Sequence, residues 1–242
     1  MAVVKKTPTM VSIPNHFCPG CGHGILNRLI AEVIEEKGYE KKTILTLGVG
    51  CSCNMNGSWN GDKIQTAHGR AAATATGVKV ARPDLLSIAY QGDGDAYVIG
   101  LAETLNAAYR NEPITVFIIN NNNFAMTGGQ VAPTTPEKAR TMTTPYGSAE
   151  PRFDVCALAQ TAGATHVERW TTAQPMQCKK AMERALNHKG FSLIEIVSQC
   201  PTHFGRYALK TGDPIAVQNW IKEHTYTDAQ AKKMSPDELE GK

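Results

Sequence analysis

The sequence lacks the features that place a protein in a membrane or on nucleic acid. No stretch approaches the roughly 18 consecutive apolar residues of a membrane span, and the N-terminal arm, residues 1–17, has no apolar segment behind its lysines. Lys and Arg form no stripe with interleaved aromatic residues, and the formal net charge of +3 is close to balance. We therefore expect a cytoplasmic protein with no membrane span and no nucleic-acid partner.

Internal repeats and low-complexity runs are also missing, so nothing indicates a repeat architecture or a long linker. The 242 residues, 42% of them hydrophobic, suffice for one sizeable core, whereas two domains would each be small. We expect a single domain over residues 1–242. Its N-terminal arm carries cysteines, and its tail beyond Tyr207 has few large apolar residues and should form a surface helix and a loose end.

The sequence does contain a regular alternation of strand and helix patterns. Short apolar runs predict strands at residues 43–49, 85–90, 114–119, 164–170 and 191–197. Amphipathic or alanine-rich segments predict helices at residues 24–37, 70–81, 96–109, 153–162 and 173–186. Because helices connect strands that are apolar throughout, we expect an α/β fold with a doubly wound, mostly parallel sheet covered on both faces.

The expected strands end in the most unusual residues of the chain. These follow four strands and are Gly50-Cys51-Ser52, Gly92-Asp93-Gly94-Asp95, Asn120 to Asn123, and Gln199-Cys200-Pro201. In doubly wound sheets, ligands bind outside the carboxyl ends of the strands. We therefore expect the four segments to form one site.

The acidic turn and the asparagine run together predict a metal-bridged phosphate site. Gly92 and Gly94 allow the backbone to approach a phosphate, and Asp93 offers a carboxylate oxygen of the kind that Mg2+ prefers. Asn121 follows Asp93 by 28 positions (121 − 93), the length of one helix plus one strand, so an amide oxygen from the next strand end can complete the ligand set. A Gly-Asp-Gly turn alone is more often structural, and an NAD site would need a G-x-G-x-x-G segment after a strand, which is missing.

The cysteines indicate a second metal centre. Cys18 and Cys21 form a glycine-rich Cys-x-x-Cys pair, which serves both zinc sites and iron–sulfur clusters. A zinc ribbon needs a second such pair, but Cys51 and Cys53 are one residue apart and Cys200 is alone. We therefore favour a 4Fe-4S cluster over zinc, and the residues alone leave open the choice between Cys51 and Cys53. The remaining cysteines lie inside expected helices and fit small buried thiols: Cys156 and Cys178.

Six motifs in collinear order over residues 15–206 resemble the β subunits of 2-oxoacid:ferredoxin oxidoreductases. They are Cys-Pro-x-Cys (Cys18–Cys21), Gly-x-Gly-Cys-Ser (Gly48–Ser52), His-Gly-Arg (His68–Arg70), the Mg2+ loop (Gly92–Asp95), Thr-Gly-Gly-Gln (Thr127–Gln130) and Cys-Pro (Cys200–Pro201). The resemblance implies a thiamine-diphosphate-binding fold. It also implies oxidative decarboxylation of a 2-oxoacid with coenzyme A to acyl-CoA and CO2, with electrons passing singly through the cluster to ferredoxin.

The resemblance also implies the roles of individual residues. The implied Mg2+ ligands are Asp93, the Asn121 side chain and the Asn123 carbonyl, and the implied cluster ligands are Cys18, Cys21, Cys51 and Cys200, which leaves Cys53 as a departure with no assigned role. We expect the cofactor to be held by Gly50, Cys51, Ser52, His68, Gly92, Asp93, Gly94, Asp95, Asn121, Asn123, Ala125, Met126 and Thr127. Among these, His68 and Met126 are the candidate catalytic residues, although a lone histidine is more often a structural hydrogen-bonding group.

No glutamate falls in a motif suited to activating the aminopyrimidine ring of the cofactor. The resemblance implies that a separate α subunit supplies it, so that this chain is inactive alone, and leaves room for γ and ferredoxin-like δ subunits. The segment 200–206 is similar to subunits assigned to 2-oxoglutarate, which is the expected substrate. A branched-chain 2-oxoacid or pyruvate is the alternative substrate. A non-redox thiamine lyase or synthase and a non-catalytic electron-transfer module are the alternative functions.

Overall fold

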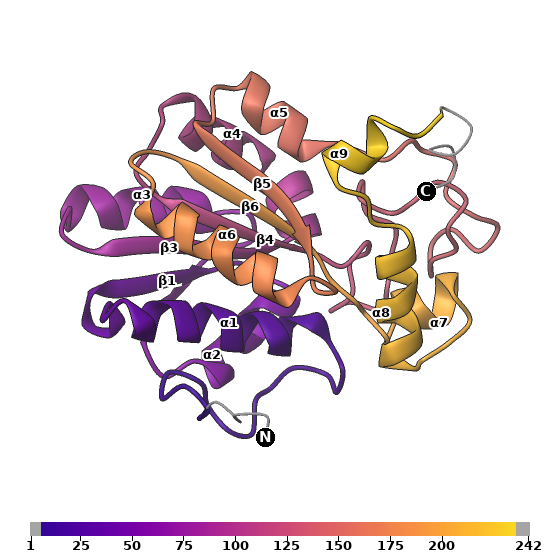
Figure 1. Cartoon of the computed structure of the whole chain (residues 1–242), viewed down its shortest axis with the longest axis horizontal. Coiled ribbons are helices and arrows are strands. Elements are labelled where there is room, and N and C mark those ends of the chain that lie inside the picture. Colours follow the sequence, from indigo (N-terminus) through magenta and orange to yellow (C-terminus); the bar gives the residue numbers. More distant parts are fainter. Residues whose placement is uncertain (1–5, 236–242) are drawn as a thin grey trace.

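The structure, a computed structural model, describes residues 6–235 and contains a six-stranded sheet between two layers of helices (Figure 1). The strands are β1 (Thr43–Leu47), β2 (Asp62–Gln65), β3 (Leu86–Gly92), β4 (Thr115–Asn120), β5 (His166–Thr171) and β6 (Ser192–Val197). Their order in the sheet is β2-β1-β3-β4-β6-β5, and every neighbouring pair is parallel. The predicted doubly wound parallel sheet is therefore confirmed.

Helices on both faces form two separate hydrophobic cores. On one face lie α1 (Gly22–Glu36) and α6 (Pro175–Asn187), and on the other lie α3 (Ala71–Ala81), α4 (Leu101–Tyr109) and α5 (Val155–Thr161). Successive residues of a strand face opposite sides of the sheet, so a sheet covered on both faces needs apolar residues at every position. This explains why all of β4 is buried and why the strand segments read as uninterrupted apolar runs.

The segment after β6 folds over the edge of the sheet as three short helices: α7 (Phe204–Ala208), α8 (Pro214–Glu223) and α9 (Asp228–Ala231) (Figure 1). The rings of Phe204 and Trp220 lie 5.4 Å apart, and Val217 and Ile221 are buried. The expected surface helix of the tail is present as α8, but its inner side packs against α7. The end of the expected loose segment, residues 236–242, lies outside the described residues.

Two expectations were incomplete. The edge strand β2 was not predicted because its residues are mostly exposed and show no apolar run. The single helix expected over residues 96–109 is instead a π-helical turn, Asp95–Ile99, followed by α4. The remaining short elements are two 3-10 turns, Glu40–Lys42 and Cys51–Asn54, and α2 (Met55–Ser58). Among residues 6–235, no helix is both long and apolar enough to cross a bilayer.

Candidate active site

The carboxyl ends of β1, β3, β4 and β6 bring the four expected site segments to one edge of the sheet. These strands are neighbours and parallel, so the segments that follow them leave the sheet side by side. The Gly48 N–H donates to the Tyr90 carbonyl at 3.0 Å, and the Ser198 N–H donates to the Asn120 carbonyl at 2.8 Å. These bonds extend the pairing of β1 with β3 and of β4 with β6 up to the start of each loop.

Three buried side-chain oxygens lie at the ends of β3 and β4. Asp93 is buried, receives a hydrogen bond of 2.6 Å from the Thr134 hydroxyl, and has its pKa raised to about 7, chiefly by burial. The Oδ1 atoms of Asn121 and Asn123 are buried and have no hydrogen-bond partner within residues 6–235. Buried polar atoms are rarely left unpaired, and one carboxylate with neutral oxygens is the donor set that Mg2+ takes beside phosphate. Asp93 and the Asn121 side chain therefore fit the implied cation, whereas the unpaired Asn123 oxygen is a side-chain atom and not the carbonyl that the resemblance implies.

The loop after β1 supplies a hydroxyl group that suits a phosphate. Ser52 is fully buried, and its Oγ has no hydrogen-bond partner among the residues that the structure describes. Gly50, with φ of 106°, makes the turn that leads into this segment, a conformation that other residues rarely adopt. An unpaired buried hydroxyl next to an acidic turn is consistent with a phosphate oxygen as its missing partner.

His68 and Asp95 lie close together beside this loop. Nδ1 of His68 is 2.5 Å from Oδ1 of Asp95, and the histidine side chain is 38% exposed whereas the carboxylate is buried. Asp95 was expected to contact the cofactor, but backbone and side-chain groups of this chain occupy its oxygens. A direct contact between Asp95 and the cofactor therefore stays a prediction that the geometry does not favour.

The loop after Asn123 borders the same edge. Ala125 is buried against Cys200, whereas Met126 is 46% exposed. The Thr127 hydroxyl donates to Oε1 of Gln130 at 2.8 Å, which closes the loop. Met126 is thus accessible to a ligand, while Thr127 is occupied in holding the turn.

The four expected cluster cysteines lie within electrostatic range of one another. Burial raises the pKa of Cys21 to about 12, with smaller contributions from Cys200 and Cys18. The pKa of Cys51 is also raised, first by burial and then by Cys21, Cys200 and Cys18. Cys51 packs against the small apolar cluster that contains Cys200. Within residues 6–235, however, no three His, Cys, Asp or Glu side chains are close enough to hold a single metal ion. Four thiols drawn from three segments of the chain are the kind of donor set that an iron–sulfur cluster takes.

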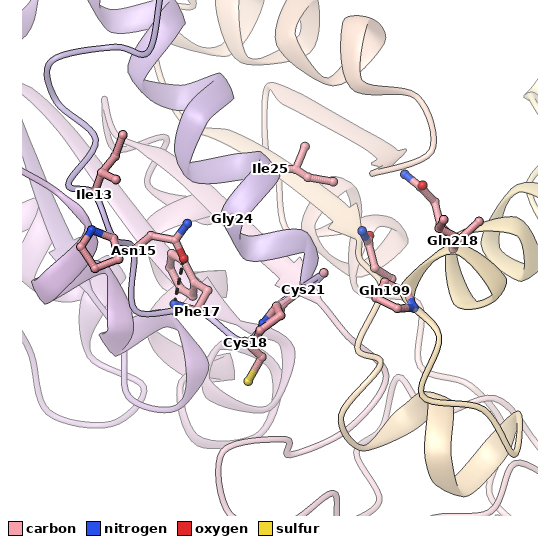
Figure 2. Close-up of a pocket in the computed structure, with 14 residues that line it drawn as sticks. Ile13, Asn15, Phe17, Cys18, Cys21, Gly24, Ile25, Gln199 and Gln218 are labelled. Carbon is pink, nitrogen blue, oxygen red and sulfur yellow. Dashed lines mark hydrogen bonds between the residues drawn. The ribbon is translucent and has the colours of Figure 1, made fainter.

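Two glycines allow the N-terminal arm to approach the end of β6. A Cβ at Gly20 (φ of 73°) would overlap Pro214 of α8, and a Cβ at Gly22 would overlap Oγ of Ser198. Figure 2 shows Cys18 in the arm and Cys21 just before α1, with Gln199 from the segment after β6 near them. These residues line a pocket of about 700 Å3. Close backbone packing at these glycines thus brings the cysteines of the arm towards Cys200.

The other cysteines have separate surroundings. Cys156 and Cys178 lie in α5 and α6, as predicted, and are buried. The Cys178 thiol donates to the Thr171 carbonyl at 3.1 Å. Cys53 is half-buried in the 3-10 turn after β1, and nothing in the structure assigns it a role.

Sequence reasoning missed two residues that hold the acidic turn in place. Thr134 binds Asp93, and Gln91 donates to Oδ2 of Asp95 at 2.6 Å. Thr134 lies in an irregular segment 41 positions after Asp93, so no spacing rule could connect the two. Gln91 is a polar residue inside an apolar strand, and this break in the pattern was the available signal.

The comparisons with known proteins show the family to which the chain belongs. The family described as thiamine pyrophosphate enzyme, C-terminal TPP binding domain, matches residues 48–196. The chain is 43% identical to the 2-oxoglutarate synthase subunit KorB of Methanocaldococcus jannaschii over 231 residues, covering 95% of this chain and 85% of that protein. The chain belongs to the family of thiamine pyrophosphate enzymes that contains this KorB subunit.

Two further members of the family are informative. A solved structure of the 2-oxoglutarate:ferredoxin oxidoreductase from Magnetococcus marinus, with 2-oxoglutarate, coenzyme A and succinyl-CoA bound, superposes with a TM-score of 0.77 at 37% identity, over 83% of this chain and 69% of that chain. The ketoisovalerate oxidoreductase subunit VorA of Methanothermobacter thermautotrophicus is 40% identical over 78% of this chain, but the match spans only 42% of VorA. The family match over residues 48–196 contains Ser52, Asp93 and the asparagine run, whereas three of the four cysteines lie outside it.

Proposed function

We propose that this chain is the thiamine-diphosphate-binding β subunit of a 2-oxoacid:ferredoxin oxidoreductase. The complete enzyme would convert 2-oxoglutarate and coenzyme A to succinyl-CoA and CO2 and pass the electrons to ferredoxin. The observation that carries the proposal is the presence at one sheet edge of two distinct ligand sets, the buried oxygens of Asp93, Asn121 and Asn123 and the four cysteines. A thiamine enzyme without redox chemistry would need only the first set.

The oxygen set would hold Mg2+ and, through it, the cofactor diphosphate. Asp93, the side chain of Asn121 and the carbonyl of Asn123 would be the protein ligands, and the Ser52 hydroxyl would donate to a phosphate oxygen. The Nδ2 of Asn123 donates to the Asn121 carbonyl at 2.7 Å, which keeps the turn compact. When bound, thiamine diphosphate would supply the nucleophilic carbon and the electron sink needed for decarboxylation. The protein would position the cofactor and balance the negative charge of its diphosphate through the bound cation.

The cysteine set would hold a 4Fe-4S cluster through Cys18, Cys21, Cys51 and Cys200. Without metal, burial favours the protonated thiols at Cys21 and Cys51, as their raised pKa values indicate. Cluster assembly would therefore release protons, and the negative charge of the thiolates would be balanced by iron.

An α subunit would complete the site. No glutamate of this chain is assigned to the aminopyrimidine ring, and the rim near His68 carries exposed apolar side chains, Val98 and Ile99, that suit a protein partner. The α subunit would supply the activating glutamate and part of the substrate site. Coenzyme A and ferredoxin would be the other participants, and γ and δ subunits would be further components of the complex.

The experiment is a steady-state assay of the complete complex, purified anaerobically, that measures ferredoxin reduction dependent on both oxoacid and coenzyme A. We expect the highest kcat/KM with 2-oxoglutarate. The 40% identity to VorA favours a branched-chain 2-oxoacid as the second candidate, so 2-oxoisovalerate and pyruvate are assayed alongside. A higher kcat/KM with 2-oxoisovalerate would overturn the assignment of 2-oxoglutarate as the substrate. Decarboxylation without ferredoxin reduction, or a cluster without thiamine diphosphate, would overturn the whole proposal.

A further inference from the structure

The carboxylate of Asp95 is the centre of a buried set of contacts at the first turn after β3. Its Oδ1 accepts the backbone N–H of Gly69 at 2.8 Å and that of Val49 at 3.1 Å, and its Oδ2 accepts Nε2 of Gln91 at 2.6 Å. Nδ1 of His68 lies 2.5 Å from Oδ1. Asp95 thus joins the loop after β1, the His-Gly-Arg loop and the end of β3 through one side chain.

Glycines at three positions leave room for this arrangement. A Cβ at Gly48 would overlap the carboxylate of Asp95 itself. Gly69 (φ of 75°) and Gly100, at the end of the π-helical turn, touch backbone to backbone, and a Cβ on either would overlap the other. Arg70 adds a hydrogen bond of 3.1 Å to the Ile99 carbonyl. The loop that carries His68 is therefore held against the π-helical turn that carries Asp95.

This close contact restrains the His68 ring. A carboxylate beside Nδ1 of a histidine favours the tautomer that carries its proton on that nitrogen, and leaves Nε2 available for another group. The side chain of His68 is 38% exposed, so its outer edge is accessible, whereas the carboxylate of Asp95 is buried. Asp95, in contrast, is covered by its partners, which keeps its negative charge from facing an anionic ligand.

We propose that Asp95 is a positioning residue that holds His68 by Nδ1, so that Nε2 of His68 faces the diphosphate of thiamine diphosphate. Asp95 itself does not contact the cofactor. The inference rests on the proposed function, because it needs a diphosphate at this edge of the sheet. It gives a role to Asp95, the second aspartate of the Gly-Asp-Gly-Asp turn, whereas the first aspartate, Asp93, would bind the cation.

The first test needs no activity. Imidazole 15N NMR of the full-length, metal-free chain labelled in histidine, with His68→Asn to identify the signals, reports which ring nitrogen carries the proton. We expect Nδ1 of His68 to be protonated in the wild type and the tautomer preference to be lost in Asp95→Asn. Asp84→Asn is the matched control, because Asp84 is exposed, pairs with Arg82 before β3 and lies far from the site along the strand.

The second test measures the dissociation constant of thiamine diphosphate with Mg2+ for the complete complex. Asp95→Asn and His68→Asn should each weaken binding by about tenfold or more, and the double variant should be no weaker than either single variant, because both changes remove one interaction. Gly48→Ala displaces the carboxylate without changing its charge and should weaken binding in the same way. This variant provides the test if Asp95→Asn does not fold.

The outcomes separate the inference from the proposed function. Unchanged His68 signals in Asp95→Asn, or losses of affinity that multiply in the double variant, would overturn the positioning role while leaving the proposed function intact. A wild-type complex that does not bind thiamine diphosphate at all would overturn the proposed function, and the diphosphate contact of His68 with it. The NMR comparison would still report whether Asp95 orients the ring.

Discussion

The side-chain amide of Asn120 donates to Oε1 of Glu195 at 2.8 Å, joining β4 to β6 directly beneath the asparagine turn. Oδ1 of Asn120 in turn accepts the backbone N–H of Asn122 at 3.0 Å. Glu195 is 2% exposed and also pairs with Arg169. A buried carboxylate inside the sheet therefore supports the turn that carries Asn121, although it is not part of the proposed ligand set.

Removing this carboxylate should destabilise the fold. Glu195→Ala leaves the buried Asn120 amide without its partner and leaves Arg169, whose side chain is 42% exposed, paired with Asp154 alone. Loss of a buried hydrogen bond to a charged group costs about 1.5–3 kcal/mol. Denaturant unfolding of the metal-free chain measures the loss. Glu112→Ala is the control, because its ion pair with Arg110 is partly exposed and should contribute less than about 1 kcal/mol. Equal effects of the two substitutions would contradict a supporting role for Glu195.

Removal of the cation or of its carboxylate ligand should release the cofactor. Asp93→Ala, or treatment of the wild-type complex with EDTA, should weaken thiamine diphosphate binding by at least about 100-fold, because the diphosphate would then lie beside unpaired buried oxygens without a bridging charge. Cofactor retained after gel filtration measures the effect. Asp62→Ala, an exposed aspartate on the edge strand β2, serves as the control. Full retention of the cofactor in Asp93→Ala would rule out the proposed cation site.

His23 should make the stability of the chain depend on pH. It is fully buried between Phe17 and Tyr90, with its Nδ1 2.6 Å from the tyrosine hydroxyl, and burial lowers its pKa from 6.5 to about 3. Between these values the unfolded chain binds a proton that the folded chain does not, so the free energy of unfolding should fall as the pH is lowered from 6.5 towards 3. The slope from this group is at most about 1.4 kcal/mol per pH unit.

Asp93 acts in the opposite direction, because its raised pKa stabilises the folded metal-free chain at low pH and this contribution is lost as the pH rises towards 7. The prediction for His23 is therefore tested as a difference. The free energy of unfolding is measured against pH for the wild type and for His23→Gln, and the difference between the two curves should shrink as the pH falls below 6.5. A difference that is independent of pH would show that His23 titrates normally in the folded chain.

The contrast between β3–β4 and the rest of the site indicates what a sequence can predict. Buried parallel strands can be recognised in the sequence as apolar runs, because both faces of such a sheet must be apolar. Since β3 and β4 are neighbours in the sheet, their carboxyl ends place Asp93 beside the asparagine run. Hydrogen-bond partners that lie in irregular segments have no comparable pattern in the sequence. Thr134 reaches Asp93 from an irregular loop, and no sequence pattern indicates that Asp95 accepts the backbone N–H groups of Gly69 and Val49. The edge strand β2 shows no apolar pattern, because exposed positions are free to be polar.

Cys51 and Cys53 offer a sharp final test, since the sequence motif alone does not distinguish them. Cys51 packs beside Cys200, and its pKa responds to Cys21, Cys200 and Cys18. Cys53 lies two residues further along the same 3-10 turn. The anaerobically purified complex with Cys51→Ser should therefore lose most of its iron and its visible absorption. The complex with Cys53→Ser, which makes the same chemical change in the same turn, should retain both.

Iron and sulfide analysis measures the outcome, and a loss of iron in Cys53→Ser with retention in Cys51→Ser would reverse the assignment. Retention of iron in both variants would remove the turn after β1 from the cluster altogether, because a thiolate ligand replaced by a hydroxyl should weaken cluster binding.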